Sequence, residues 1–499
     1  MHKLTVAIIC VLFISRCIAQ PKPEFRGVWI ATVDNIDWPS KGNYNSDSQK
    51  VEFIRILDMH QRNGMNAVIA QIRPATDAFY PSPYEPWSEW LTGKQGSPPN
   101  PYYDPLQFMI EETHKRGMVF HAWCNPYRAV FTLNKSSIAP THVTRLHPEW
   151  FLNYGDKKYF DPGNKDAQQF VVNVIRDIVS RYDIDAIHFD DYFYPYRIAG
   201  KEFPDDSSYS KYNNGLSKDD WRRSNVDSII VFLSRVIKEE NKQCQFGISP
   251  FGIWRNKSQD PDGSETQGGQ TNYDDLYADI VLWLKKGWID YVTPQIYFEL
   301  GHPRAEYKTL LDWWSTHSYG KHCYIGLGIY KANTNAAWKD KSQLPRQIEA
   351  LRNTANVQGM IFFSSKSFNN NPNGWSDSLR LNYFKEPAPI PPMEWIIAKA
   401  PEKPEIKLTA SSSYANFAAF KLTDQNGLGG AANFIVYKFK VDDTNKVIEN
   451  SKEVYRVLSA VNGENLLVIP QMEDAALKYA VSVVNKSNIE SEMVFIGGR

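Results

Sequence analysis

Apolar and polar positions along the chain follow two alternating patterns. Short runs of consecutive apolar residues predict strands that are buried on both faces. Between them lie segments with apolar residues at spacings of three and four, which predict amphipathic helices. The predicted strands are Phe25–Ile30, Ala67–Arg73, Val119–Cys124, Ile184–Phe189, Gln245–Pro250, Asp290–Tyr297, Cys323–Ile329 and Gly359–Ser364. The predicted helices are Val51–Asn63, Pro105–Arg116, Ala167–Arg181, Ser224–Asn241, Leu276–Lys286, Ala305–Ser315 and Leu344–Thr354.

The order of these elements predicts an α/β fold, namely a (β/α)8 TIM barrel. Helices end at Gly64, Gly117 and Gly287, and a strand follows each glycine within a few residues. Long irregular segments instead follow the carboxyl ends of strands, where such a barrel builds its active face. These segments are Ala75–Asp104, Arg128–Asn164, Tyr196–Asp220 and Trp254–Asn272.

The barrel pattern spans residues 24–384, and a different pattern follows it. Residues 385–403 are rich in proline and predict a stiff, extended linker. Residues 404–499 carry short alternating segments without helical periodicity, such as Phe434–Phe439 and Leu477–Val484. We therefore predict a small β-sandwich. Its last long segment is similar to the closing strands of fibronectin type III modules.

Residues 1–19 have the features of a secretory signal peptide. A short positive start precedes the apolar run Leu4–Ile14, which is too short to span a bilayer. Small residues then predict cleavage before Gln20, and hence an extracytoplasmic protein, in the periplasm or secreted. Lipidation of Cys17 is the alternative, but Arg16 directly before it fits a lipobox poorly. No later stretch is long and apolar enough to cross a membrane.

Composition narrows the class of partner. The chain has 56 Lys and Arg against 56 Asp and Glu, and it contains no basic block, so we do not expect it to bind nucleic acid. Aromatic residues make up 14% of the chain. Their flat apolar faces suit stacking on sugar rings, although large barrels also use aromatic residues in their cores.

The cysteines do not indicate a disulfide framework or a metal site. Cys124, Cys244 and Cys323 remain after the signal peptide, an odd number at wide spacing, and the two of them that lie on or near predicted barrel strands are expected to be small buried residues. No Cys or His cluster has metal-ligand spacing, so we predict no metal or other cofactor. The segment Asp260–Gly263 lacks the rest of a calcium loop and predicts a turn.

Two adjacent carboxylates follow the fourth predicted strand. Asp190 and Asp191 stand where a barrel enzyme presents carboxylates to its substrate, although a salt-bridged strand end or a helix cap is the structural alternative. Side chains alternate along a strand, so both can face inward only if the strand has ended; we favour Asp190. Glycoside hydrolysis usually needs two carboxyl groups. Glu299 is the leading candidate for the second and Asp77 the next, and each has a structural role as its alternative.

Seven of the eight predicted strand ends carry polar or aromatic residues on the same side of the barrel. Together they predict a substrate-binding site. The candidate binding residues are Arg26, Trp29, Arg73, Asp77, Trp123, Asn125, Tyr127, Arg128, His188, Tyr192, Tyr194, Trp254, Gln295, Tyr297 and Lys366.

Several long motifs resemble the bacterial glycosyl-hydrolase-like family ten. They are Phe25–Trp29, Gln71–Pro74, Asp77–Tyr80, Ala122–Arg128, His188–Pro195 and Gly247–Gly252, and the resemblance covers roughly residues 24–384. It implies a (β/α)8 barrel in an extracytoplasmic enzyme. It also implies cleavage of peptidoglycan glycan strands, including strands stripped of their peptides, with a catalytic role for the Asp190-Asp191 motif.

A looser similarity to chitinase-type barrels suggests that the substrate's own acetamido group acts as nucleophile. Asp185, Asp190 and Tyr297 match that pattern, whereas His188 and Tyr192 stand where an Asp and a Glu are expected. The sequence thus favours a hydrolase of N-acetylated glycan, above all peptidoglycan. A glycosidase for host or dietary polysaccharide, and a glycan-binding barrel without turnover, are the alternatives.

Overall fold

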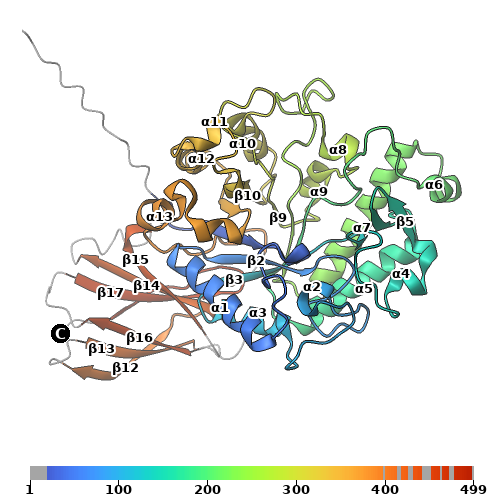
Figure 1. Cartoon of the computed structure of the whole chain (residues 1–499). Coiled ribbons are helices and arrows are strands. Elements are labelled where there is room, and N and C mark those ends of the chain that lie inside the picture. The colour runs from blue at the N-terminus through green and yellow to red at the C-terminus, as the bar shows by residue number, and fades with distance from the viewer. Residues whose placement is uncertain are drawn as a thin grey trace, which may run out of the picture.

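The computed structural model describes residues 20–396, 399–412, 417–424, 431–440, 451–460, 464–470 and 477–496. Parallel strands close into a barrel in the order β1-β11-β10-β9-β8-β7-β3-β2, which confirms the predicted TIM barrel (Figure 1). The predicted signal peptide lies outside the described residues. The barrel strands are β1 (Phe25–Ile30), β2 (Ala67–Arg73), β3 (Val119–Cys124), β7 (Ala186–Phe189), β8 (Gln245–Ile248), β9 (Tyr291–Val292), β10 (His322–Leu327) and β11 (Gly359–Phe362).

Helices surround the barrel, and side chains at their first residues define where they start. Asn45, Asn164 and Ser217 each accept a hydrogen bond from a backbone N–H of the first turn that follows. The longer helices are α1 (Ser46–Arg62), α3 (Pro105–His114), α5 (Lys165–Arg181), α6 (Asp206–Tyr212), α7 (Lys218–Glu240), α9 (Ile280–Lys286), α10 (Tyr307–Thr316) and α12 (Gln343–Arg352). The shorter ones are α2 (Glu89–Thr92), α4 (Val143–Leu146), α8 (Asn272–Asp275), α11 (Ala336–Lys339) and α13 (Trp375–Ser378).

The sixth barrel strand is shorter than the sequence predicted. The apolar run Asp290–Tyr297 predicted one continuous strand, but β9 contains two residues. Pro294 has no N–H to donate and therefore interrupts the ladder. Pairing resumes at Gln295, which bridges to Phe251 and Gly326. The interruption leaves the loop after β9 free to turn toward the barrel mouth.

The barrel interior is filled by aromatic and aliphatic side chains. Phe25 stacks on Tyr324 with ring centroids 4.0 Å apart, and Ile390 of the linker packs in the same cluster. Gly247 is required here, because a Cβ atom at that position would lie 1.9 Å from the ring of Tyr291.

The cysteines of the described residues, Cys124, Cys244 and Cys323, are all buried and form no disulfide, whereas burial was predicted for two of them.

Two antiparallel sheets form the C-terminal part, with orders β12-β13-β16 and β15-β14-β17-β18. They pack on the end of the barrel where strands begin: Lys486 pairs with Asp183, which precedes β7, and the backbone N–H of Met393 donates to the carbonyl of Ser487 at 3.1 Å (Figure 1). The opposite end of the barrel is left open. The fibronectin type III likeness stays a prediction. These strands are β12 (Glu405–Ser412), β13 (Phe417–Thr423), β14 (Ala431–Lys440), β15 (Val454–Ser459), β16 (Glu464–Pro470), β17 (Leu477–Asn485) and β18 (Val494–Ile496).

Among the described helices, none is both long enough and apolar enough to cross a membrane.

Candidate active site

A cavity of about 530 Å³ opens at the carboxyl end of the barrel strands. The loop after β3 borders it with a small sheet made of β4 (Arg128–Val130), β5 (Phe151–Tyr154) and β6 (Lys157–Phe160). Its walls are mainly aromatic, with polar groups at a few points, as is usual for sugar sites. The lining residues are Trp29, Ala31, Val33, Ile36, Gln71, Trp123, Arg128, Phe131, Asp190, Asp191, Tyr192, Tyr196, Ser249, Phe251, Gln295, Tyr297, Phe298, Tyr330, Lys331 and Phe363.

Both carboxylates of the fourth strand line this cavity. β7 ends at Phe189, so the alternation of side chains along the strand no longer applies to Asp190 and Asp191. Both residues are buried, with exposed fractions of 4% and 3%. The sequence favoured Asp190 as the one aspartate that faces the cavity, whereas the structure places both Asp190 and Asp191 in its lining.

Asp190 is held by hydrogen-bond donors on one of its oxygens. The indole N–H of Trp123 donates to Asp190 Oδ2 at 3.2 Å, and Asn125 Nδ2 donates to the same oxygen. Gln71 fixes the orientation of the Asn125 amide, because its Nε2 donates to Asn125 Oδ1 at 2.5 Å. Burial raises the pKa of Asp190, and the Arg128 guanidinium and these donors oppose that rise.

Asp191 has a different environment. The hydroxyl of Tyr196 donates to Asp191 Oδ2. Burial raises the pKa of Asp191, and the neighbouring Asp190 carboxylate raises it further. Two carboxylates this close do not both ionise easily, so the pair retains a proton well above the ordinary range of aspartate. The donors around Asp190 favour placing that proton on Asp191.

A buried polar chain lies beneath the pair. The indole N–H of Trp29 donates to Nε2 of His188 at 3.2 Å, and Nδ1 of His188 lies 2.8 Å from the hydroxyl of Tyr291. Burial lowers the pKa of His188, so the ring is neutral and accepts at Nε2. His188 thus holds the Trp29 ring in place from below the cavity.

Two further side chains complete the electrostatics of the cavity. The guanidinium of Arg128 lies 4.6 Å from the ring centroid of Tyr192, and its charge lowers the pKa of both aspartates. Tyr297 comes from the loop after β9, and burial raises the pKa of its phenol well above the ordinary value, with smaller contributions from both carboxylates of the pair. The phenol of Tyr297 is therefore neutral, and the residue lines the cavity.

Several predicted residues lie elsewhere in the fold. Arg26 is near the start of β1, at the opposite end of the barrel, where its Nε donates to Glu24 at 2.8 Å. Its predicted place at the strand's carboxyl end is wrong, because the strand runs four residues beyond it. Asp185 is also at that opposite end and accepts from the backbone N–H of Phe120 at 2.7 Å.

Arg73 and Asp77 organise the loop after β2 instead of lining the cavity. Arg73 is fully buried in an ion pair with Glu85, with Nε donating to its two oxygens at 3.0 and 2.9 Å. Asp77 accepts from the backbone N–H of Ala75 at 3.2 Å, and burial raises the pKa of Asp77 to about 7. Strand-end position alone did not distinguish these residues from ligand-facing ones.

Glu299, the leading second carboxyl, is also outside the described cavity lining. Its Oε2 accepts from the indole N–H of Trp338 at 3.1 Å, while its backbone carbonyl accepts from Tyr307. Tyr127 and Tyr194 are buried in the core of the barrel mouth. The structure therefore leaves the Asp190-Asp191 pair as the carboxyl groups of the described cavity lining.

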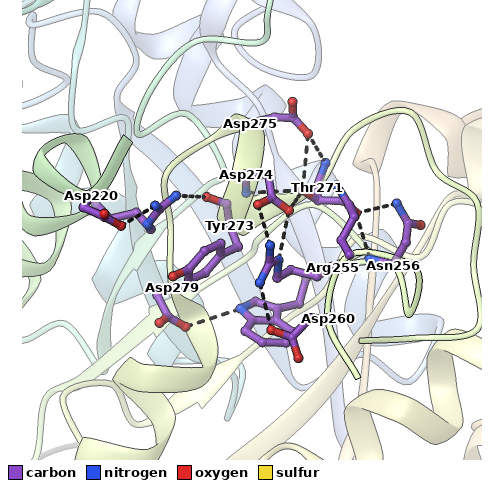
Figure 2. A network of polar contacts seen from close by, with 12 residues as sticks. Asp220, Arg255, Asn256, Asp260, Thr271, Tyr273, Asp274, Asp275 and Asp279 are labelled. Carbon is purple, nitrogen blue, oxygen red and sulfur yellow. Dashed lines mark hydrogen bonds and ion pairs between the residues drawn. The ribbon is translucent and has the colours of Figure 1, made fainter. Parts of the chain in front are cut away.

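Trp254 lies beside a polar network on the loops after β8, in which Figure 2 labels Arg255, Asp274 and Asp279. Its indole N–H donates to Asp279 at 3.3 Å, and its ring stacks on Trp313. Beside it, Arg255 pairs with Asp274 at 2.9 Å and with Asp260 at 2.8 Å, so the Asp260 turn is held by a cation of the protein itself.

Removing the charge of Glu85 is expected to destabilise the fold. Glu85→Gln leaves the Arg73 guanidinium buried without a counter-charge, which costs about 3 kcal/mol or more. Urea unfolding of the purified variant measures this loss. Glu239→Gln is the matched control, because its pair with Arg176 is half exposed and is worth under about 1 kcal/mol. Equal midpoints for the two variants would contradict the expectation.

Some cavity residues escaped the sequence analysis. Tyr196 lies in one of the long predicted loops, and its hydroxyl donates a hydrogen bond to Asp191. The other cavity residues of this kind, Tyr330, Lys331 and Phe363, follow the seventh and eighth strands. The only sequence signal was their location just past strand ends, which many structural residues share.

Many glycoside hydrolases have a closed (β/α)8 barrel, with two side-chain carboxyl groups in an aromatic cavity where the barrel strands end. The chain belongs to the family described as glycosyl hydrolase-like 10, whose model matches residues 24–344. The family resemblance of the sequence motifs is thereby confirmed, and the chain is a glycosyl hydrolase by homology.

Two named relatives support this membership. The glycosyl hydrolase YngK of Bacillus subtilis (strain 168) is 48% identical over 412 residues, which cover 81% of this chain and 80% of YngK. The glycosyl hydrolase DigH of Escherichia coli (strain K12) is 36% identical over 376 residues, covering 70% of this chain and 85% of DigH. Among solved structures, the PgaB (BpsB) glycoside hydrolase domain from Bordetella bronchiseptica matches 72% of this chain and 98% of its own, with 14% identity and a TM-score of 0.47.

Proposed function

We propose that this enzyme hydrolyses N-acetylated glycan, specifically the glycan strands of peptidoglycan, with the substrate's acetamido group as nucleophile. The carrying observation is that Asp190 and Asp191 are adjacent in the chain and are the carboxylates of the described cavity lining. A classical pair flanks the scissile bond from two sides. Adjacent carboxyls instead suit a mechanism in which the substrate supplies the nucleophile and the protein supplies an acid and a negative charge.

The environments of the two aspartates assign their roles. Asp191, the better proton holder, donates a proton to the oxygen of the leaving sugar. Asp190 remains a carboxylate and accepts the acetamido N–H, which orients the acetamido oxygen toward the anomeric carbon and stabilises positive charge as it develops. Tyr297 donates to the acetamido oxygen. Water then opens the cyclic intermediate, with Asp191 as base.

The choice of peptidoglycan rests on the sequence motifs, and the matched relatives are named only as glycosyl hydrolases. We further propose that the predicted signal peptide at residues 1–19 carries the enzyme out of the cytoplasm. Peptidoglycan lies on that side of the membrane. Aromatic side chains such as Trp29 and Trp123 supply faces on which sugar rings stack.

Release of new reducing ends tests the proposed function. Purified peptidoglycan, with and without its stem peptides, is incubated with the enzyme, and products are identified by mass spectrometry. Products built from whole disaccharide repeats are expected. Parallel assays use chitin oligosaccharides and plant or host polysaccharides. Turnover of a polymer without 2-acetamido groups would contradict the mechanism, and binding of glycan without any product would favour a non-catalytic barrel.

The pH dependence follows from the proton on Asp191. A general acid must be protonated, so kcat falls as pH rises through its pKa. Burial and Asp190 raise that pKa, so the descending limb should lie well above the value near 3.9 of an ordinary aspartate, toward neutral pH. Initial rates on peptide-free glycan strands across the pH range measure the limb. A descending limb at the ordinary aspartate value would contradict the assignment.

A further inference from the structure

A second hollow adjoins the catalytic cavity. It has a volume of about 350 Å³ and lies between helix α1 and the segment that follows β11. Ile36 lines both spaces and is 37% exposed, so it forms the ridge between them. We call this hollow the side basin. Its lining residues are Asn35, Ile36, Asp37, Ser40, Lys41, Glu52, Arg55, Ile56, Met59, Lys366 and Asn369.

The acidic residues of the side basin are already engaged by protein donors. Asp37 accepts from the backbone N–H groups of Ala31 and Lys366, each at 2.7 Å, and from the hydroxyl of Ser364 at 2.9 Å. Glu52 accepts from the backbone N–H of Ser40 at 3.0 Å and from that residue's hydroxyl. The carboxylate of Asp37 is therefore held inside the protein, whereas that of Glu52 is engaged by Ser40 at the surface.

The basic residues of the side basin are placed differently. Lys366, which the sequence predicted in the substrate-binding site, is absent from the lining of the catalytic cavity and lines the side basin instead. Arg55 and Lys366 are exposed, and the salt bridges among the described residues include neither side chain. Lys41 pairs with Asp34 at 3.8 Å, and both of those side chains are more than half exposed. The side basin thus presents cations to solvent beside a cavity that also carries Lys331 on its wall.

We infer that the side basin is an accessory subsite for an anionic segment of the glycan, beyond the sugars held at the Asp190-Asp191 pair. This inference rests on the proposed function, in which the substrate is a polymer. A peptidoglycan strand without peptides carries one free carboxylate on every second sugar. A strand that continues over Ile36 brings such a carboxylate to Arg55 and Lys366. Strands with amide-linked peptides lack that charge.

The occupant is an acidic polysaccharide and not a compact anion. The cations of the side basin come from separate elements, Arg55 from α1 and Lys366 from the segment after β11. A polymer that crosses α1 and the segment after β11 contacts both Arg55 and Lys366. The same polymer is also bound in the adjacent catalytic cavity. Affinity gained in this way depends on chain length, because a short substrate fills the cavity and does not reach the basin.

Kinetics on substrates of two lengths test the inference. Wild type and the double variant Arg55→Gln/Lys366→Gln are assayed on long peptide-free glycan strands and on a tetrasaccharide of the same repeat. The KM for long strands should rise about three- to tenfold at low ionic strength, as expected for two exposed ion pairs, and the difference should shrink with added salt. The kcat and the tetrasaccharide kinetics should not change. Arg62→Gln, an exposed arginine of the same helix outside the basin, is the matched control.

Long strands with chemically amidated carboxylates provide the matched substrate, and wild type and double variant should handle them alike. Unchanged KM for the acidic strands, or an equal rise for both lengths, would overturn the inference while leaving the proposed function intact. If wild type releases no reducing ends from any strand, the proposed function fails. Calorimetric binding of long strands to wild type and double variant then decides the subsite separately: weaker binding by the variant retains it, and equal binding overturns it.

Discussion

Asp191→Asn is expected to lower kcat on peptidoglycan glycan by about 10²- to 10⁴-fold, the usual contribution of a general acid. An amide cannot give up a proton to the departing sugar oxygen. The side chain keeps its shape, and Tyr196 still has an oxygen to which it can donate. The loss should therefore appear in kcat, with a small change in KM, when reducing-end release is measured under saturating substrate.

Leaving-group chemistry separates this role from a structural one. In the first turnover, Asp191→Asn should release the leaving group of an aryl glycoside of an N-acetylated sugar at nearly the wild-type rate, because that group departs without a proton and only the later opening of the cyclic intermediate needs Asp191 as base. A variant that had merely disturbed the cavity would lose activity on both substrates. An equal loss on the polymer and on the activated glycoside would remove Asp191 from the acid role.

Much of the fold was predictable because its signals are local. Strands such as Val119–Cys124 and helices such as Pro105–His114 follow from runs of apolar residues, their periodicity and the residues that cap them. The sixth strand was wrong because one proline interrupts a run that looks continuous in composition. Boundaries of this kind depend on single backbone donors.

The site was predictable only in part. Asp190 and Asp191 stood out because charge directly after a buried strand is rarely accidental at this end of a barrel. Arg73 is also a charged residue at the end of a buried strand, but it pairs with Glu85. The two residues are twelve positions apart, and this spacing does not predict their contact. Tyr196 reaches Asp191 by the path of a loop. Loop residues meet through tertiary structure, so their partners cannot be read from periodicity.

Asp190 and Asp191 differ in their hydrogen-bond partners, and the side-chain partners of Asp190 come from another strand of the barrel and the residue that follows it. Trp123 lies near the end of β3 and Asn125 follows that strand, and β3 is adjacent to β7 in the barrel, so their donors converge on Asp190. Asp191 lies one residue further and is bonded by Tyr196 from its own loop. Two identical side chains thus acquire different affinities for a proton, as general acid–base chemistry requires.

Asp190→Asn is expected to lower kcat by about 10²- to 10³-fold on both the polymer and the activated aryl glycoside, because charge stabilisation is needed whichever group leaves. The variant loses the negative charge beside the acetamido N–H. Its one remaining oxygen is the acceptor for Trp123 and Asn125, so its amide group faces the acetamido N–H and cannot accept from it. Equal losses on the two substrates would contrast with the substrate-dependent loss of Asp191→Asn.

The residual activity of Asp190→Asn carries a second signature. The negative charge of Asp190 raises the pKa of Asp191, so its removal lowers that pKa. The descending limb of the pH–rate profile should therefore move to lower pH in the variant, relative to wild type. A cavity that was only distorted would lose rate without moving the limb. An unmoved limb, or activity on the aryl glycoside at the wild-type level, would show that Asp190 does not act through the charge it shares with Asp191.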